Sequence, residues 1–328
     1  MRNRCLLGFL CVVGSLAPLH AQVPDTLKST PDSLLTYADS LAIFRLIDSL
    51  MTLEEAQGST LSFRIGYNSN ILDAGRTLGI SQFGLSPGIT YYHKSGVYAD
   101  ITAYWSRDFE PNLYLTTMSV GYLHLFSDKI SAMASFDHFF YNYEDDYYVP
   151  YSNSASVSGM VDFNPLSIRL DYSFYFGHAH ANRIMPGINA NLRKKDFLFF
   201  DRISFYPAVL VLFGDQQITE IEIVRPSSVQ EALENILKFG SRFGYRVTER
   251  SVFGIMNYAF SAPLNLTLGN WMFNITYTYN IPHPVDNEPL ALERSGYLSA
   301  SILYNLNFAS TPSPNHKITN HKSQITNH

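Results

Sequence analysis

The sequence predicts an all-β protein: an antiparallel up-and-down transmembrane β-barrel of about 12 strands, with about 10 or about 14 as alternatives, preceded by a short amphipathic helix. Three observations support this fold class. From residue 61 onward, apolar and polar residues alternate with a period of two. Only 16% of residues are charged, whereas 46% are hydrophobic and 14% are aromatic. No stretch after residue 22 approaches the roughly 18 consecutive apolar residues of a spanning helix, so lipid-facing strands must close into a barrel without open sheet edges.

Residues 1–21 have the layout of a secretory signal peptide. Two arginines precede the apolar run 5–16, and Ala21 ends a plausible cleavage site. The apolar run is too short to span a bilayer as a helix. Both cysteines, Cys5 and Cys11, lie in this segment, so we expect a mature protein without disulfides or cysteine metal sites.

Two segments are predicted between the signal peptide and the barrel. Residues 22–32 are polar and proline-containing, which is typical of a linker. In residues 33–57, apolar positions such as Leu35 and Leu46 recur at three- and four-residue steps, and Gly58 follows. This pattern predicts an amphipathic periplasmic helix that rests on the barrel mouth or pairs with a partner.

The barrel region is predicted to be residues 61–308. In its first strand the apolar Leu61 and Phe63 alternate with the polar Ser62 and Arg64, and the same alternation recurs along the chain. The predicted strands are 61–70, 82–93, 96–106, 113–126, 129–141, 153–163, 166–177, 184–193, 201–213, 251–268, 270–281 and 296–308.

The connections between these strands are expected to alternate between short turns and longer loops. The longer ones are predicted at 71–81, 107–112, 142–152, 178–183, 214–250 and 282–295. In outer-membrane barrels the short turns face the periplasm and the long loops face outward. With an even number of strands, both chain termini are then expected on the periplasmic side.

The last strand ends at Phe308 after apolar residues at every second position from Leu298. It resembles the C-terminal signature of bacterial outer-membrane β-barrels, an alternating strand closed by an aromatic residue. The resemblance implies a porin-like protein of a Gram-negative outer membrane, inserted by the barrel assembly machinery through this strand. The dense use of tyrosine and phenylalanine is similar to that of Bacteroidota barrels. Residues 309–328 depart from the signature, and their polar repeats predict a disordered tail.

Six ionisable residues fall on inward positions of the predicted strands. Because hydrocarbon is a poor environment for charge, the alternation places them in the lumen. Two interpretations are open: ion pairs that brace the interior, with Arg169 and Asp171 as neighbours on one face, or a role in solute selectivity. The predicted lumen-lining residues are Arg64, Asp100, Asp137, Asp162, Arg169 and Asp171.

Three other features invite chemical interpretations. His178 and His180, with Asp171 on the preceding strand, could serve a hydrolase or bind a metal ion, but no serine lies within the loop and a polar loop is the preferred interpretation. The acidic and aromatic loop 142–152 could bind Ca²⁺ or a sugar, although a solvated loop is preferred. In loop 214–250, Ser228 and Glu231 form a capping-box pattern that predicts a short helix, as a lid, a constriction or a surface feature.

These observations favour a narrow porin-like channel or transporter for small polar solutes, since most inward positions hold Ser, Thr, Asn, Gly or Tyr. No catalytic residue, metal ion or cofactor is predicted, and the net charge of −5 argues against nucleic acid. Two alternatives stay open. One is a structural or partner-binding barrel of an envelope or secretion assembly, with a periplasmic partner bound by residues 33–57. The other is an outer-membrane hydrolase. Membrane lipid is the expected surrounding of the barrel in each case.

Overall fold

A computed structural model describes residues 58–69, 84–142, 151–239, 243–285 and 293–308. The predicted signal peptide, linker, N-terminal helix and C-terminal tail lie outside the described residues and stay predictions. Within the described residues, no helix has the length and apolar character needed to cross a membrane.

The described secondary structure is almost entirely strand, as the period-two alternation predicts. The elements are β1 (Ser59–Asn68), β2 (Gly84–Tyr92), β3 (Val97–Trp105), β4 (Leu113–Ser127), β5 (Ile130–Tyr141), β6 (Tyr151–Asp162), β7 (Leu166–Gly177), β8 (His180–Ala190), β9 (Leu192–Phe197), β10 (Phe200–Phe205), β11 (Ala208–Val224), α2 (Val229–Phe239), β12 (Gly244–Leu268), β13 (Trp271–Pro282) and β14 (Ser295–Phe308).

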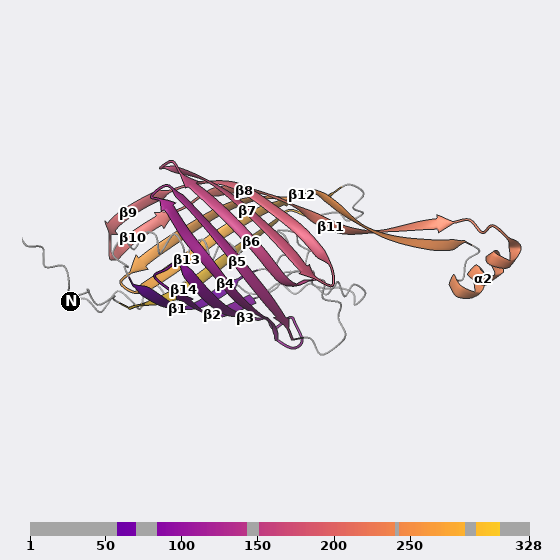
Figure 1. The fold of residues 1–328 in the computed structure, drawn as a ribbon, viewed down its shortest axis with the longest axis horizontal. Coiled ribbons are helices and arrows are strands. Elements are labelled where there is room, and N and C mark those ends of the chain that lie inside the picture. Colours follow the sequence, from indigo (N-terminus) through magenta and orange to yellow (C-terminus); the bar gives the residue numbers. More distant parts are fainter. Residues whose placement is uncertain (1–57, 70–83, 143–150, 240–242, 286–292, 309–328) are drawn as a thin grey trace, which may run out of the picture. The chain divides into compact units, whose positions relative to one another are not determined.

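The strands form one antiparallel sheet that closes when β1 pairs with β14 (Figure 1). β10 and β11 both pair with β12, so they are one wall strand interrupted at Tyr206 and Pro207. β8 and β9 are likewise one wall strand, because β8 pairs with β11 and β9 pairs with β10. The wall therefore has twelve strands, and the predicted barrel of about 12 strands is confirmed.

The two ends of the barrel differ in their connections. Ser59 pairs with Phe308, so the first and last strand residues lie at the same end. The same end carries the turns that join β2 to β3, β4 to β5, β6 to β7, β9 to β10 and β12 to β13. We call this end the short-turn rim and the opposite end the loop rim.

Two predicted loops are wrong. Segment 178–183 is a two-residue turn, because β7 ends at Gly177 and β8 begins at His180, so turn length does not alternate there. Much of segment 214–250 is strand. Beyond the Gly214–Arg183 pair, β11 leaves β8, and residues 215–224 pair with residues 244–253 as a two-stranded ribbon that continues past the wall (Figure 1).

The short helix predicted in this segment is confirmed as α2, at the tip of the ribbon. Ser228 Oγ accepts a hydrogen bond from the Glu231 amide at 3.1 Å, which is the predicted N-cap contact. The Glu231 carboxylate accepts hydrogen bonds from the amide and hydroxyl of Ser227, at 2.7 and 2.6 Å, in place of the expected contact to Ser228. The bond to Ser228 occupies an amide donor that the first helical turn leaves free, and the bonds from Ser227 hold the Glu231 side chain over the start of the helix.

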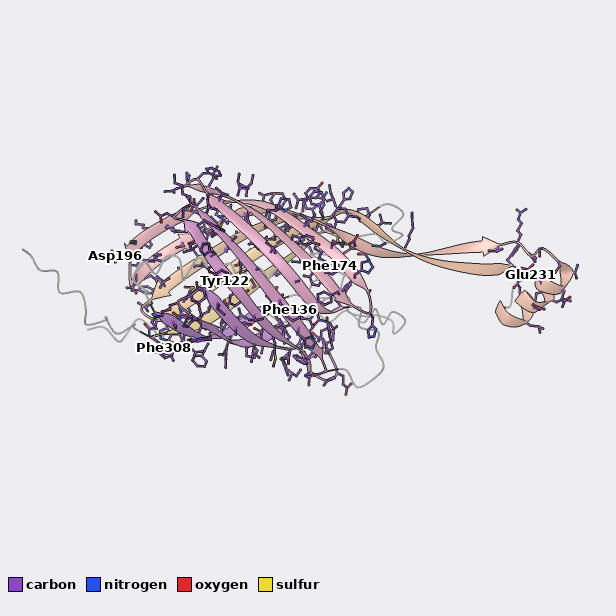
Figure 2. The ribbon with its side chains drawn as sticks, viewed as in Figure 1. Tyr122, Phe136, Phe174, Asp196, Glu231 and Phe308 are labelled. Carbon is purple, nitrogen blue, oxygen red and sulfur yellow. The ribbon has the colours of Figure 1, made fainter. Side chains whose placement is uncertain are left out.

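Side chains alternate between the two faces of the sheet along the wall strands. Outward positions are apolar and exposed: Tyr122 and Phe136, labelled in Figure 2, are 45% and 43% exposed. Inward positions are buried and mostly polar, as in Thr102 and Asn274. The barrel therefore has its apolar surface outside and its polar groups inside, the reverse of a water-soluble protein.

One inward aromatic residue packs where a neighbouring strand has no side chain. Tyr98 on β3 lies over Gly121 on β4, and a Cβ atom at Gly121 would stand only 2.5 Å from the ring. Leu123 and Met133 pack against the same tyrosine. The glycine thus makes room for a large side chain inside the wall.

Candidate functional site: the barrel interior

The interior is lined mainly by hydroxyl and amide groups. Thr102 is 1% exposed and Asn274 is 3% exposed, whereas the outward Ile65 is 64% exposed. The hydroxyls and amides form chains across neighbouring strands: the Ser62 hydroxyl donates to Asn305 at 2.6 Å, and Asn274 donates to Asn265. The inward side chains therefore cover one another and form a continuous polar lining.

Charged residues are distributed unevenly around this interior. Among the described residues, the inward wall positions of β12, β13 and β14 hold no charged side chain, and we call these three strands the neutral arc. The inward charged residues lie mostly on the strands from β1 to β8, which we call the charged arc. The charged arc contains Arg64 on β1, Asp100 on β3, Asp137 on β5, Arg169 and Asp171 on β7, and Arg183 on β8.

Arg64 reaches Asp100 across an intervening strand. The guanidinium donates a hydrogen bond to Thr102 at 2.7 Å and lies 3.8 Å from the Asp100 carboxylate. Between them, on β2, stands Gly88, where a Cβ atom would be 3.1 Å from the Arg64 guanidinium and 2.7 Å from the Thr102 hydroxyl. The missing side chain lets the arginine lie flat over β2.

The two carboxylates Asp100 and Asp137 belong to one cross-strand row. Thr90, Asp100, Ser119, Asp137 and Ser154 follow one another in register on β2 to β6, so hydroxyls and carboxylates alternate. Thr90 donates to Asp100 at 2.5 Å, and Ser154 donates to Asp137 at 2.7 Å. Each carboxylate thereby replaces water with hydroxyl donors, which a buried anion requires.

Arg169 and Asp171 form an ion pair on one strand. They are two residues apart on β7, so their side chains share the inward face. The Arg169 Nε atom lies 2.5 Å from the Asp171 carboxylate, and both side chains are less than one-tenth exposed. The structure thus places them as the neighbours that the sequence predicts, and it favours the bracing interpretation for this pair.

Asp162 has a different position from the other five predicted lumen residues. It ends β6 at the short-turn rim, where its carboxylate accepts a hydrogen bond from the Asn164 amide at 2.8 Å. A second contact joins it to Asn191 at 3.4 Å. Asp162 therefore stabilises the β6–β7 turn, and it does not line the middle of the lumen.

The structure does not assemble a catalytic group around His178 and His180. His180 is exposed at the loop rim and pairs with Phe176, whereas Asp171 is buried and pairs with Met185. Five residue pairs separate them, or about 16 Å at roughly 3.3 Å per residue. Within the described ranges, no cluster of three metal-ligating side chains occurs. Most of the acidic loop 142–152 lies outside those ranges.

Sequence reasoning missed two sets of inward residues. Arg183, whose guanidinium carbon lies 4.9 Å from the centre of the Tyr175 ring, fell just before the predicted start of its strand. A cluster of inward residues at the loop rim, which we call the aromatic wall, was also missed. The period-two pattern could have shown Tyr104, Phe139 and Tyr175, which continue the inward positions of their strands, whereas Tyr114 and Tyr151 lie at irregularities of the register. The aromatic wall comprises Tyr104, Tyr114, Leu115, Phe139, Tyr151 and Tyr175.

Comparisons with known proteins give structural matches only. No family model and no curated protein matches the sequence. The KdgM porin is 10% identical, with 75% of this chain and 98% of that chain covered and a TM-score of 0.40. The NanC porin is 9% identical, with 75% and 100% covered and a TM-score of 0.38. The translocator domain of the autotransporter NalP from Neisseria meningitidis is 11% identical, with 83% and 99% covered and a TM-score of 0.35.

Proposed function

We propose that this protein spans a bacterial outer membrane and is a narrow channel for small polar solutes. The observation that carries the proposal is the inverted barrel: an exposed apolar outer face around a closed wall with a polar interior. A closed strand ladder satisfies every backbone group without water, which is the condition for crossing hydrocarbon with strands.

The outer face supports the membrane assignment in its details. Its middle is aliphatic, with residues 48% to 57% exposed: Ile89, Ile101, Val120, Val157 and Ile302. Aromatic residues flank this zone. The ring centroids of Trp271 and Tyr304 lie 4.7 Å apart near the short-turn rim, with the rings tilted by 53°, and Phe140 and Phe176 lie near the loop rim. Such aromatic belts mark the two membrane interfaces of outer-membrane barrels.

Strand length agrees with a bilayer crossing. β3 has 9 residues. At roughly 3.3 Å per residue they extend about 30 Å, and a tilt of about 40° reduces this to about 23 Å along the membrane normal. That height is close to the apolar band of about 25 Å in outer-membrane barrels.

The orientation and the assembly route are part of the proposal. The short turns and both ends of the sheet share one rim, so we place the short-turn rim and both termini in the periplasm. β14 ends at Phe308, which is 50% exposed on the outer edge of the sheet and available to the barrel assembly machinery (Figure 2).

The interior supports a polar solute with little net charge. The charged arc contains three arginines and three aspartates. In two Arg–Asp pairs, the guanidinium and the carboxylate lie within 4 Å of each other. Their charges therefore cancel in the lumen, while the neutral arc offers hydrogen bonds without charge. A lumen of this kind discriminates weakly between cations and anions.

Planar-bilayer recording of the refolded full chain tests the proposal. We expect small unitary current steps, because the interior is narrow, and a reversal potential near zero in a salt gradient. Ser301→Asp adds a carboxylate to an inward position of the neutral arc, so the current should become cation-selective, whereas Ser301→Asn should leave selectivity unchanged. Folded protein that gives no current steps would refute the channel.

A further inference from the structure

Within the described part of the chain, the neutral arc contains a compact group of buried polar atoms without hydrogen-bond partners. We call this group the open patch. Each member lies on an inward position of β12, β13 or β14 and is at most 9% exposed. The unpartnered atoms are Asn257 Oδ1, Ser261 Oγ, Thr278 Oγ1, Asn280 Nδ2 and Ser295 Oγ.

These atoms are neighbours on the sheet. Ser261 pairs with Thr278 in register, and Asn280 pairs with Ser295. The Asn257 amide nitrogen donates to Asn280 Oδ1 at 2.8 Å, which leaves the remaining oxygen of Asn257 and nitrogen of Asn280 unused. The open patch thus offers one amide acceptor, one amide donor and three hydroxyls that both donate and accept.

Buried polar groups in folded proteins are almost always hydrogen-bonded, and each exception needs an explanation. Five adjacent exceptions on one wall leave donors and acceptors that a bound solute or ordered water would satisfy. The neighbouring Thr276, on the same strand, shows the contrast: its hydroxyl donates to Asn274 at 3.1 Å and needs no further partner.

The strand order places the aromatic wall opposite the open patch. In a closed wall of twelve strands, strands six positions apart face each other. β4, β5 and β6, which carry Tyr114, Phe139 and Tyr151, are therefore opposite β12, β13 and β14. Both groups lie towards the loop rim, since Asn257 pairs with Pro282 at the end of β13 and Ser295 begins β14.

We propose that the open patch and the aromatic wall form a binding site for an uncharged, polyhydroxylated solute, a neutral saccharide, near the outer mouth of the channel. Amides and hydroxyls bind the solute's hydroxyl groups, and the aromatic wall covers its less polar face. A charged sugar finds no counter-charge on the neutral arc, so its desolvation is not compensated there. This inference rests on the proposed function, because the solute enters through the lumen.

Isothermal titration calorimetry of the detergent-folded full chain tests the site without requiring conduction. The probes are raffinose, a neutral trisaccharide, and trigalacturonate, an anionic trisaccharide. We expect binding of raffinose and weaker binding of trigalacturonate. Loss of the Thr278 hydroxyl in Thr278→Val should weaken raffinose binding roughly three- to tenfold, the effect of one neutral hydrogen bond. Ser261→Ala should act in the same direction and checks the result if Thr278→Val folds poorly.

Thr276→Val is the matched control, since it removes an inward hydroxyl of the same strand that already has a partner. It should lower the unfolding midpoint and leave raffinose affinity within about twofold of wild type. Thr278→Val should not lower the unfolding midpoint, because the hydroxyl that it removes lacks a partner in the free protein.

Each remaining result has a definite meaning. Raffinose binding without bilayer current would refute the channel and support the saccharide site. Current without raffinose binding would refute the saccharide site alone, and an unfolding midpoint lowered by Thr278→Val would then assign the open patch to ordered water. Equal binding of trigalacturonate, or equal raffinose affinity of wild type and Thr278→Val, would also overturn the inference.

Discussion

Gly121 offers a direct test of how the interior is packed. In Gly121→Ala, the new Cβ would lie 2.5 Å from two ring carbons of Tyr98 and 2.6 Å from its hydroxyl oxygen. The ring cannot move away easily, because it is 3% exposed and packs against Leu123 and Met133. Overpacking of this kind costs about 1–3 kcal/mol. Replacing a glycine returns about 0.4–1 kcal/mol through the unfolded chain, so a net loss of about 1–2 kcal/mol is expected.

Gly159→Ala is the matched control, since Gly159 lies on β6 and a Cβ atom added there would have no other atom within 4 Å. It should leave stability unchanged or raise it by about 0.5–1 kcal/mol. Guanidinium unfolding of the full chain, followed by fluorescence of the chain's two tryptophans, measures both free energies. Tyr98→Leu in the Gly121→Ala background should remove most of the added cost. If Gly121→Ala is no more destabilising than Gly159→Ala, the packing argument is wrong.

Three further outcomes are expected. Arg169→Met leaves the Asp171 carboxylate buried without its cation and should cost about 3–5 kcal/mol in the same unfolding assay, whereas the double change to Met and Leu should cost less; equal costs would count against the pair. Hydrogen bonds from Ser227 lower the pKa of Glu231 below its ordinary value of 4.5. The contribution of this carboxylate to the helix cap is therefore fully present above pH 4.5 and is lost as the pH falls through the lowered pKa. The protection factors of the α2 amides, which are exchange rates corrected for the intrinsic effect of pH, should fall in acid, and Glu231→Gln should remove that fall; protection that does not change in acid would contradict this. Replacing residues 216–252 by an Asn-Gly turn should leave barrel unfolding and current steps unchanged, because the ribbon there pairs with itself; a barrel that fails to fold would show that the ribbon supports the wall.

Local patterns in the sequence were sufficient to predict the wall. The alternation predicts a strand at 96–106, and the structure has β3 at Val97–Trp105. The prediction succeeds because the period of two is a property of the strand itself. Arg169 and Asp171 could be placed side by side for the same reason. The capping pattern at Ser228 likewise needs only neighbouring residues, and α2 begins where it predicts.

The ribbon was missed because its strands leave the alternation of the wall. Ile218, Ile221 and Ile223 are β-branched residues of the kind that favour strands, but charged residues between them resemble a loop. Their pairing with residues 244–250 is non-local, and no period within either segment reveals it. The two-residue turn after Gly177 was missed for a related reason, since polar residues there suggested a longer loop.

The arrangement of the interior depends on closure of the barrel, which no single strand encodes. The Arg64–Asp100 contact needs Gly88 on the strand between them, and its geometry follows from register across three strands. The open patch depends on pairing too, because Ser261 and Thr278 become neighbours only when β12 meets β13. Its position opposite the aromatic wall further requires that β14 close on β1. Charge cancellation on one side and unpartnered hydrogen-bonding groups on the other therefore arise from the order of the strands. The proposed selection by hydrogen bonding in preference to charge rests on that arrangement.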